Sequence, residues 1–183
     1  MKSRMDSRER SRTKPLLLID VDGPLNPYLA LTAERAPEGY ARHWMRPSGW
    51  PEDQPLAVLL NPEHGAELLA LADRYELVWA TTWEDDANAW IGPVLGLPEL
   101  PYVEWSGPER RGAPPGTFWK TPYVLEYAAG RPFAWVDDEI TSYDREWADQ
   151  RHLAAALLLR IDPGTGLTRR DFDTLAEWAA APW

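Results

Sequence analysis

Two aspartates separated by one residue and followed by glycine form the group of this chain best suited to chemistry: Asp20, Asp22 and Gly23. They follow the apolar run 16–19, so we expect both carboxylates at the carboxyl end of a buried strand. Side chains two residues apart on a strand project to the same side, and glycine lets the backbone turn sharply after them. Folding does not require such a cluster of charge, so the pattern favours a reaction centre over a simple turn.

Further polar side chains follow two other apolar runs, and one lysine precedes an expected helix: Thr81, Thr82, Asp137, Asp138 and Lys120. Four carboxylates converging on one crevice would repel one another unless a cation neutralised them. Mg²⁺ suits a site with few carboxylates plus water and phosphate. A hydroxyl from Thr81 and the ammonium of Lys120 would then suit the remaining oxygens of a phosphoryl group.

Apolar runs that read as strands alternate with helical patterns along the chain, at 15–19, 76–80, 101–105, 132–136 and 155–161. This alternation predicts an α/β fold, in which helices cover both faces of a parallel sheet. Ligands bind beyond the carboxyl ends of the strands in such sheets. The polar groups described above stand at three of those ends.

Capping residues and prolines predict where the helices begin, at 61–62, 121–122, 141–144 and 168–171. The proline-rich segment 24–55 is too long for a simple connection between a strand and a helix. Residues 40–45 and 56–60 are expected to pair as a hairpin. We therefore predict a small flap or cap insert at about 27–60, over the end of the first strand.

In this order the motifs resemble those of the haloacid dehalogenase superfamily of phosphohydrolases. The stretch 16–23 is similar to the first family motif, an apolar strand followed by Asp-x-Asp-Gly, and Leu25 and Asn26 extend the match. The later motifs are matched in chain order by Thr81 at a strand end, Lys120 near a helix start and the acid pair ending 133–138. The resemblance covers 15–162, nearly all of the chain expected to be ordered.

The resemblance implies a three-layer, Rossmann-like sheet of about five strands. The expected order of the strands across the sheet is 155–161, 132–136, 15–19, 76–80 and 101–105, so that strand 15–19 lies in the centre. The whole of 15–183 would form a single domain that carries the flap.

The resemblance also implies catalytic roles. Asp20 would attack phosphorus and form an aspartyl-phosphate, and Asp22 would protonate the leaving oxygen and then deprotonate the attacking water. Thr81 would bind a phosphoryl oxygen, with Thr82 as its rival for that role. Lys120 would balance charge at the nucleophile, and Arg110 or Arg111 are the candidates to replace it.

A magnesium ion would be held by Asp137, by Asp20 and by the backbone carbonyl of Asp22, with Asp138 assisting directly or through water. Members of the superfamily that cleave carbon–halogen bonds need neither Mg²⁺ nor the second acid. Asp22 and the acid pair therefore favour phosphoryl transfer. The structural alternatives are turn formation for the first pair of acids and helix capping for the second.

The expected activity is that of a Mg²⁺-dependent phosphatase acting on a small molecule or a nucleic-acid end, with a nucleotide or nucleic-acid terminal phosphate preferred over a sugar phosphate. Open members of the superfamily often act on large substrates, and the flap aromatics could stack on a base or pack within the flap: Tyr28, Tyr40, Trp44 and Trp50. The alternatives are a non-catalytic binding or regulatory module and a phosphotransferase. No stable protein partner is predicted.

Composition limits the other possibilities. The absence of cysteine excludes disulfides, thiolate metal sites and cysteine nucleophiles. The net charge of −10 argues against broad binding of nucleic acid, whereas 1–14 form a basic stretch expected to be a disordered tail. No apolar run approaches the roughly 20 residues that span a bilayer, and a cytoplasmic location is expected.

Four tryptophans near turns or motif ends could line a pocket or pack in the core: Trp44, Trp50, Trp83 and Trp119.

Overall fold

The computed structural model describes residues 14–33, 36–106 and 113–182. The basic stretch expected to be a disordered tail lies outside these ranges, apart from its last residue. Within the described ranges the fold is α/β, with a four-stranded parallel sheet, a separate two-stranded antiparallel sheet and five α-helices. No helix among these residues has the length and apolar character needed to cross a membrane.

The parallel sheet has the strand order β4-β1-β5-β6. Its strands are β1 (Leu16–Ile19), β4 (Glu76–Trp79), β5 (Phe133–Asp137) and β6 (Ala156–Arg160). At the end of β1, Ile19 lies opposite Trp79 of β4 and Val136 of β5. Because the pairing is parallel and in register, the carboxyl ends of these three strands meet at one edge of the sheet.

The expected fifth strand at 101–105 is not formed. Only one residue of this segment, Tyr102, makes a bridge, and its partner is Trp79 of the edge strand β4. The carbonyl of Pro101 accepts a bond from the backbone N–H of Trp79, and the N–H of Val103 donates to the carbonyl of Trp79. The pairing stops there, because the N–H groups of Leu100 and Trp105 on either side donate to the side chains of Asn88 and Glu84. Pro101 also lacks the N–H that a longer ladder would need.

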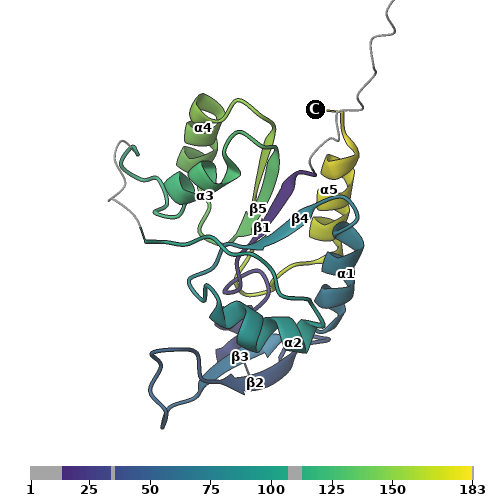
Figure 1. Cartoon of the computed structure of the whole chain (residues 1–183). Helices are drawn as coiled ribbons and strands as arrows, with labels where there is room; N and C mark the ends of the chain where they lie inside the picture. Colours follow the sequence, from purple (N-terminus) through teal and green to yellow (C-terminus); the bar gives the residue numbers. More distant parts are fainter. Residues whose placement is uncertain (1–13, 34–35, 107–112, 183) are drawn as a thin grey trace, which may run out of the picture.

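Helices cover both faces of the parallel sheet (Figure 1). On one face lie α1 (Glu63–Leu71) and α5 (Arg169–Ala180), and on the other lie α3 (Thr121–Ala128) and α4 (Ser142–Arg151). Alternate residues of each strand join the two cores. Leu17 of β1 packs in the core beneath α1 and α5, whereas its neighbour Leu18 packs beneath α3 and α4. Burial of both faces explains why the strands are apolar without alternation.

The predicted helix starts agree with the structure. Capping boxes join Thr141 to Asp144 at the start of α4 and Thr168 to Asp171 at the start of α5. At the start of α1, the side-chain oxygen of Asn61 accepts a bond from the backbone N–H two residues later.

The segment after β1 contains a short 3-10 helix, η1 (Tyr28–Thr32), and then an antiparallel hairpin of β2 (Ala41–Met45) and β3 (Leu56–Leu60). The predicted hairpin pairing is therefore confirmed. The hairpin lies beyond the carboxyl ends of the parallel strands, next to α2 (Gly92–Leu95) and the π-helical turn η2 (Ala87–Ile91) that precedes it (Figure 1).

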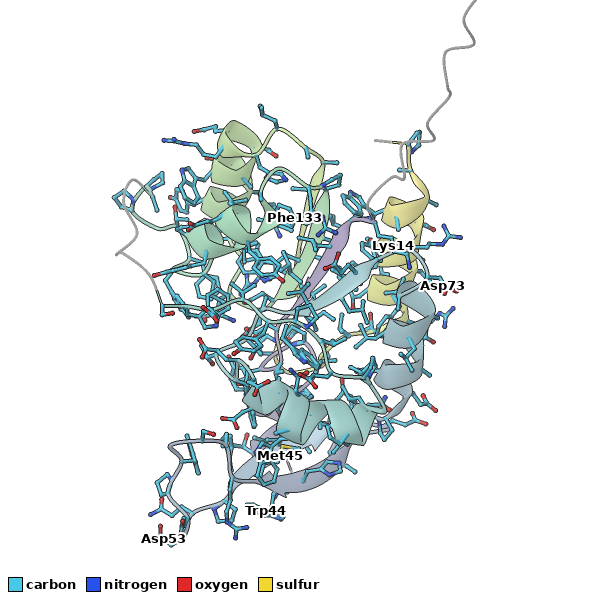
Figure 2. All side chains as sticks on the ribbon, viewed as in Figure 1. Lys14, Trp44, Met45, Asp53, Asp73 and Phe133 are labelled. Atoms are coloured by element: carbon cyan, nitrogen blue, oxygen red, sulfur yellow. The ribbon has the colours of Figure 1, made fainter. Side chains whose placement is uncertain are left out.

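Successive side chains of the hairpin face opposite ways. Trp44 is 60% exposed, whereas Met45 is buried against the body of the protein (Figure 2). The loop at the tip of the hairpin is also bound to the body, because the backbone N–H and the hydroxyl of Ser48 both donate to Asp86.

Candidate active site

Three aspartates from adjacent strand ends meet at one point. Asp20 follows β1, Asp137 ends β5, and Asp138 comes directly after it. All three are buried, and one oxygen of each lies within 4.8 Å of the others. The parallel register of β1 and β5 makes this meeting unavoidable, because Asp20 continues β1 beside the end of β5.

A buried lysine joins this group. The ammonium of Lys120 lies 2.8 Å from Oδ2 of Asp20 and 2.9 Å from Oδ2 of Asp137. Lys120 is only 4% exposed and stands immediately before α3. Its ammonium also lies over the ring of Phe118, 5.5 Å from the centroid. The lysine expected from the third motif is therefore placed beside the expected nucleophile.

The turn that carries Lys120 is fixed by another buried carboxylate. Oδ1 of Asp144 accepts a bond of 2.7 Å from the backbone N–H of Phe118 and one of 2.6 Å from the hydroxyl of Thr121. Its other oxygen caps α4 through Thr141. One buried side chain thus ties the start of α3, and with it Lys120, to α4.

The electrostatics of the group favour a bound cation. Burial raises the pKa of Asp20 well above its usual value, and the neighbouring Asp137 adds to this, while Lys120 opposes it. Burial likewise raises the pKa of Asp138. For Lys120, burial lowers the pKa, but Asp20 and Asp137 outweigh it and raise the pKa above its ordinary value. A single ammonium group thus stands beside several carboxylates, and a divalent cation would neutralise the negative charge that remains.

Asp22 lies close by and is held by two other side chains. The amide of Asn26 donates to Oδ1 of Asp22 at 2.7 Å, and the indole N–H of Trp83 donates to Oδ2 at 2.9 Å. The turn between Asp22 and Asn26 is closed by the backbone N–H of Gly23, which donates to the carbonyl of Asn26.

Gly23 is required at its position for two reasons. Its φ is +94°, in the left-handed region that favours glycine. A Cβ placed there would also lie 2.6 Å from Cβ of Asp138. Gly23, the last residue of the first motif, therefore lies directly against Asp138, the last residue of the fourth.

The two threonines of the second motif have different surroundings. Thr81 is 1% exposed, and its hydroxyl oxygen accepts a bond from the backbone N–H of Trp83. Thr82 is exposed and lines the cavity above the aspartates. The geometry therefore favours Thr82, the rival in the sequence analysis, as the threonine that faces a ligand there.

The cavity over the aspartates has a volume of about 130 Å³. Its walls combine four acids, one lysine, one threonine and two aromatic side chains: Asp20, Asp22, Asp138, Glu139, Lys120, Thr82, Tyr28 and Trp119. A larger hollow of about 450 Å³ lies beside α3, but it contains none of the motif residues. The small cavity is therefore the candidate site.

Of the aromatic residues expected to reach a ligand, Tyr28 and Trp119 line this cavity. The hydroxyl of Tyr28 also donates to Oδ2 of Asp138 at 2.9 Å. Tyr40, Trp44 and Trp50 do not line the cavity: Tyr40 stacks edge-on against a histidine of α1, and the two tryptophans are exposed on the hairpin.

Sequence reasoning missed Glu139 and the contact of Trp83 with Asp22, although both residues adjoin motif positions. The expected substitutes for Lys120, namely Arg110 and Arg111, lie outside the described residues. Asp137 is fully buried and does not line the cavity, but its carboxylate lies beside those of Asp20 and Asp138 and accepts a bond from Lys120, which does line it.

Comparison with models of protein families finds no match for this chain, and comparison with curated proteins finds none either.

Proposed function

We propose that this protein is a Mg²⁺-dependent phosphohydrolase of the haloacid dehalogenase superfamily, with a Rossmann-like fold and an aspartyl-phosphate intermediate. The observation that carries the proposal is the placement of Lys120 between Asp20 and Asp137, beside Asp138, at the carboxyl end of the sheet. A buried carboxylate paired with an ammonium and surrounded by further acids suits attack on a phosphoryl group.

The donor set fits a hard divalent cation. The three carboxylates offer oxygen ligands close enough to share one ion, and oxygen is the donor that Mg²⁺ prefers. We propose that Asp20, Asp137, Asp138 and the backbone carbonyl of Asp22 would hold it. A bound Mg²⁺ would neutralise charge on the phosphoryl oxygens.

In the proposed reaction, a carboxylate oxygen of Asp20 attacks phosphorus, and the bond from phosphorus to the leaving oxygen breaks. The carboxyl group of Asp22 gives its proton to that leaving oxygen. Water then attacks the phosphorus of the aspartyl-phosphate and loses a proton to Asp22, which releases inorganic phosphate and restores Asp20. Lys120 stabilises the charge that develops between the nucleophile and the phosphoryl group.

The cavity supports a phosphomonoester as substrate. Its volume of about 130 Å³ leaves room for a phosphoryl group and the first atoms of a leaving group. The rest of the leaving group would pass Tyr28 and Trp119, whose rings offer flat apolar surfaces. This favours a nucleotide or a nucleic-acid terminal phosphate over a sugar phosphate.

The test is phosphate release from 4-nitrophenyl phosphate and from a panel of nucleoside monophosphates, with and without Mg²⁺. We expect turnover that requires Mg²⁺ and is abolished by Asp20→Asn. Asp173→Asn, on the exposed surface of α5, is the matched control and should retain full activity.

Binding of beryllofluoride without turnover would favour a regulatory module instead, and transfer of the phosphoryl group to an added alcohol would favour a phosphotransferase. A protein that neither hydrolyses any ester nor binds the phosphate mimic would refute the proposal.

A further inference from the structure

Both carboxylate oxygens of Asp22 are engaged by other side chains. Asn26 donates to Oδ1 at 2.7 Å, and Trp83 donates to Oδ2 at 2.9 Å. A single hydrogen bond leaves a carboxylate free to rotate about its last torsion angle. Two donors on opposite oxygens remove that freedom, because rotation would break both bonds at once.

The two donors are themselves held in place. Asn26 is 3% exposed, and its own Oδ1 accepts a bond of 2.9 Å from the backbone N–H of Leu59 in β3. Trp83 is 8% exposed, and its backbone N–H donates to the hydroxyl of Thr81. The residue after Trp83, Glu84, has a φ of +47°, which L residues other than glycine seldom adopt. A strained backbone is thus retained where the indole reaches Asp22.

We propose that Trp83 and Asn26 are positioning residues that orient Asp22 for proton transfer to the leaving oxygen. This inference rests on the proposed phosphohydrolase activity. Neither side chain needs to touch the phosphoryl group; each acts through Asp22. Each oxygen of Asp22 keeps a second lone pair, so the carboxyl can still carry the proton that it gives to the leaving oxygen and later takes from water. Because Asn26 also binds β3, the hairpin is tied to the same carboxylate.

The orientation of the acid affects the rate of ester cleavage most when the leaving group must be protonated in order to depart. A 4-nitrophenolate departs readily as an anion, whereas an alkoxide departs only when it is protonated. General acid catalysis contributes about 10²–10⁴-fold where it is needed. Hydrolysis of the aspartyl-phosphate, in which Asp22 takes a proton from water, is common to both kinds of ester, so the comparison is made in kcat/KM, which reports attack on the ester. Loss of a positioning bond should therefore lower kcat/KM for alkyl phosphates and leave kcat/KM for 4-nitrophenyl phosphate nearly unaffected. A merely structural role would slow both substrates equally.

Trp83→Phe keeps an aromatic ring at this position but replaces the indole with a smaller phenyl ring, which has no N–H to donate to Asp22. We expect kcat/KM for a nucleoside 5′-monophosphate, which is an alkyl ester, to fall by about tenfold or more, and kcat/KM for 4-nitrophenyl phosphate to change by less than about threefold. Trp79→Phe is the matched control. Trp79 is also buried, and its indole N–H donates at the same distance of 2.9 Å, but to Asn88 rather than to Asp22. It should show no preference between the two substrates.

Asn26→Asp gives an independent test, and it also serves if Trp83→Phe fails to fold. It keeps an oxygen to accept the bond from Leu59, removes the amide that donates to Asp22, and sets in its place a carboxylate that repels Asp22 from its observed position. The same selective loss for the alkyl ester is expected. Equal loss for both esters, or no loss for either, would overturn the positioning role while leaving the phosphatase activity established. Absence of turnover in the unaltered protein would overturn the proposed function and this inference together.

Discussion

The ammonium of Lys120 lies 2.8 Å from Oδ2 of Asp20, and both side chains are almost completely buried. The two residues come from different elements, one directly before α3 and one directly after β1. A second carboxylate, that of Asp137, shares the same ammonium. This buried arrangement makes the site a determinant of stability as well as of the proposed activity.

Removal of the ammonium should destabilise the fold. Lys120→Gln leaves the carboxylates of Asp20 and Asp137 buried without their cation, which typically costs about 3–5 kcal/mol. We expect urea denaturation to show a loss of that size, together with loss of phosphate release. Arg169→Gln is the control, because Arg169 also pairs with two acids but its side chain is 73% exposed, and surface pairs contribute about 0–1 kcal/mol. A variant of Lys120 as stable as the unaltered protein would contradict the pairing.

The stability of the metal-free protein should fall as the pH rises from acid toward neutral. Burial holds the pKa of Asp20 well above the value of 3.8 expected in the unfolded chain. Between those two pKa values the folded state keeps a proton that the unfolded state releases, so the free energy of unfolding decreases with rising pH. Lys120 stays charged throughout, since its pKa is raised above 10.5.

If Mg²⁺ binds at Asp20 as we propose, it takes the place of that proton, so its binding should be weaker in acid. We expect Mg²⁺ to raise Tm more at about pH 8 than at about pH 5, and Asp20→Asn to reduce this difference. Thermal melts with and without Mg²⁺ at the two pH values provide the measurement. A rise in Tm that is independent of pH would count against a metal site at Asp20.

Asp144 should contribute more to stability than an ordinary helix cap. Asp144→Ala leaves the buried backbone N–H of Phe118 and the hydroxyl of Thr121 without acceptors, in addition to removing the cap of α4. We expect a loss of about 3 kcal/mol or more. Asp171→Ala removes only the equivalent capping box of α5 and should cost about 1 kcal/mol. Similar losses for the two variants in urea denaturation would show that the link to Phe118 and Thr121 contributes little.

Gly23→Ala should abolish activity through a local clash. The added Cβ would lie 2.6 Å from Cβ of Asp138 and would force that side chain to move. Gly49→Ala is the matched control, because Gly49 also has a positive φ, +77°, but has no atom within 4 Å of an added Cβ. We expect the control to lose about 1 kcal/mol in stability from backbone strain and to keep its activity. Full activity in Gly23→Ala would mean that Asp138 is not needed in its observed position.

Tyr28→Phe should weaken Mg²⁺ binding without unfolding the protein. The hydroxyl of Tyr28 donates to Oδ2 of Asp138, and this bond lowers the pKa of Asp138 against the effect of burial. Removal of a side chain that orients a metal ligand commonly costs about 10–100-fold in metal affinity. We expect the Mg²⁺ concentration that gives half-maximal phosphate release to rise by about tenfold. Tyr143→Phe, on the exposed side of α4, should leave it unchanged.

Some local features could be predicted from the sequence because they depend on neighbouring residues. The capping pairs Thr141–Asp144 and Thr168–Asp171 each bring donor and acceptor within one helical turn, so the helix starts follow directly. The strand at 101–105 was wrongly predicted for the opposite reason. Its residues pair with β4 at Tyr102 alone, because the N–H groups of Leu100 and Trp105 on either side donate to the side chains of Asn88 and Glu84. No local pattern reveals such distant partners.

The sequence by itself determined which chemistry the strand ends offer. Apolar runs without alternation imply parallel strands buried on both faces, and parallel strands bring their carboxyl ends to one edge. Asp20 and Asp137 were therefore expected at the same edge of the sheet, and the pairing of β1 with β5 brings them together. Only the tertiary structure decided how the side chains there are oriented and paired. It placed Thr82 rather than Thr81 on the cavity wall and brought Trp83 to Asp22. Those outcomes depend on the direction of each side chain and on contacts between segments far apart in the chain, neither of which the spacing of residue types specifies.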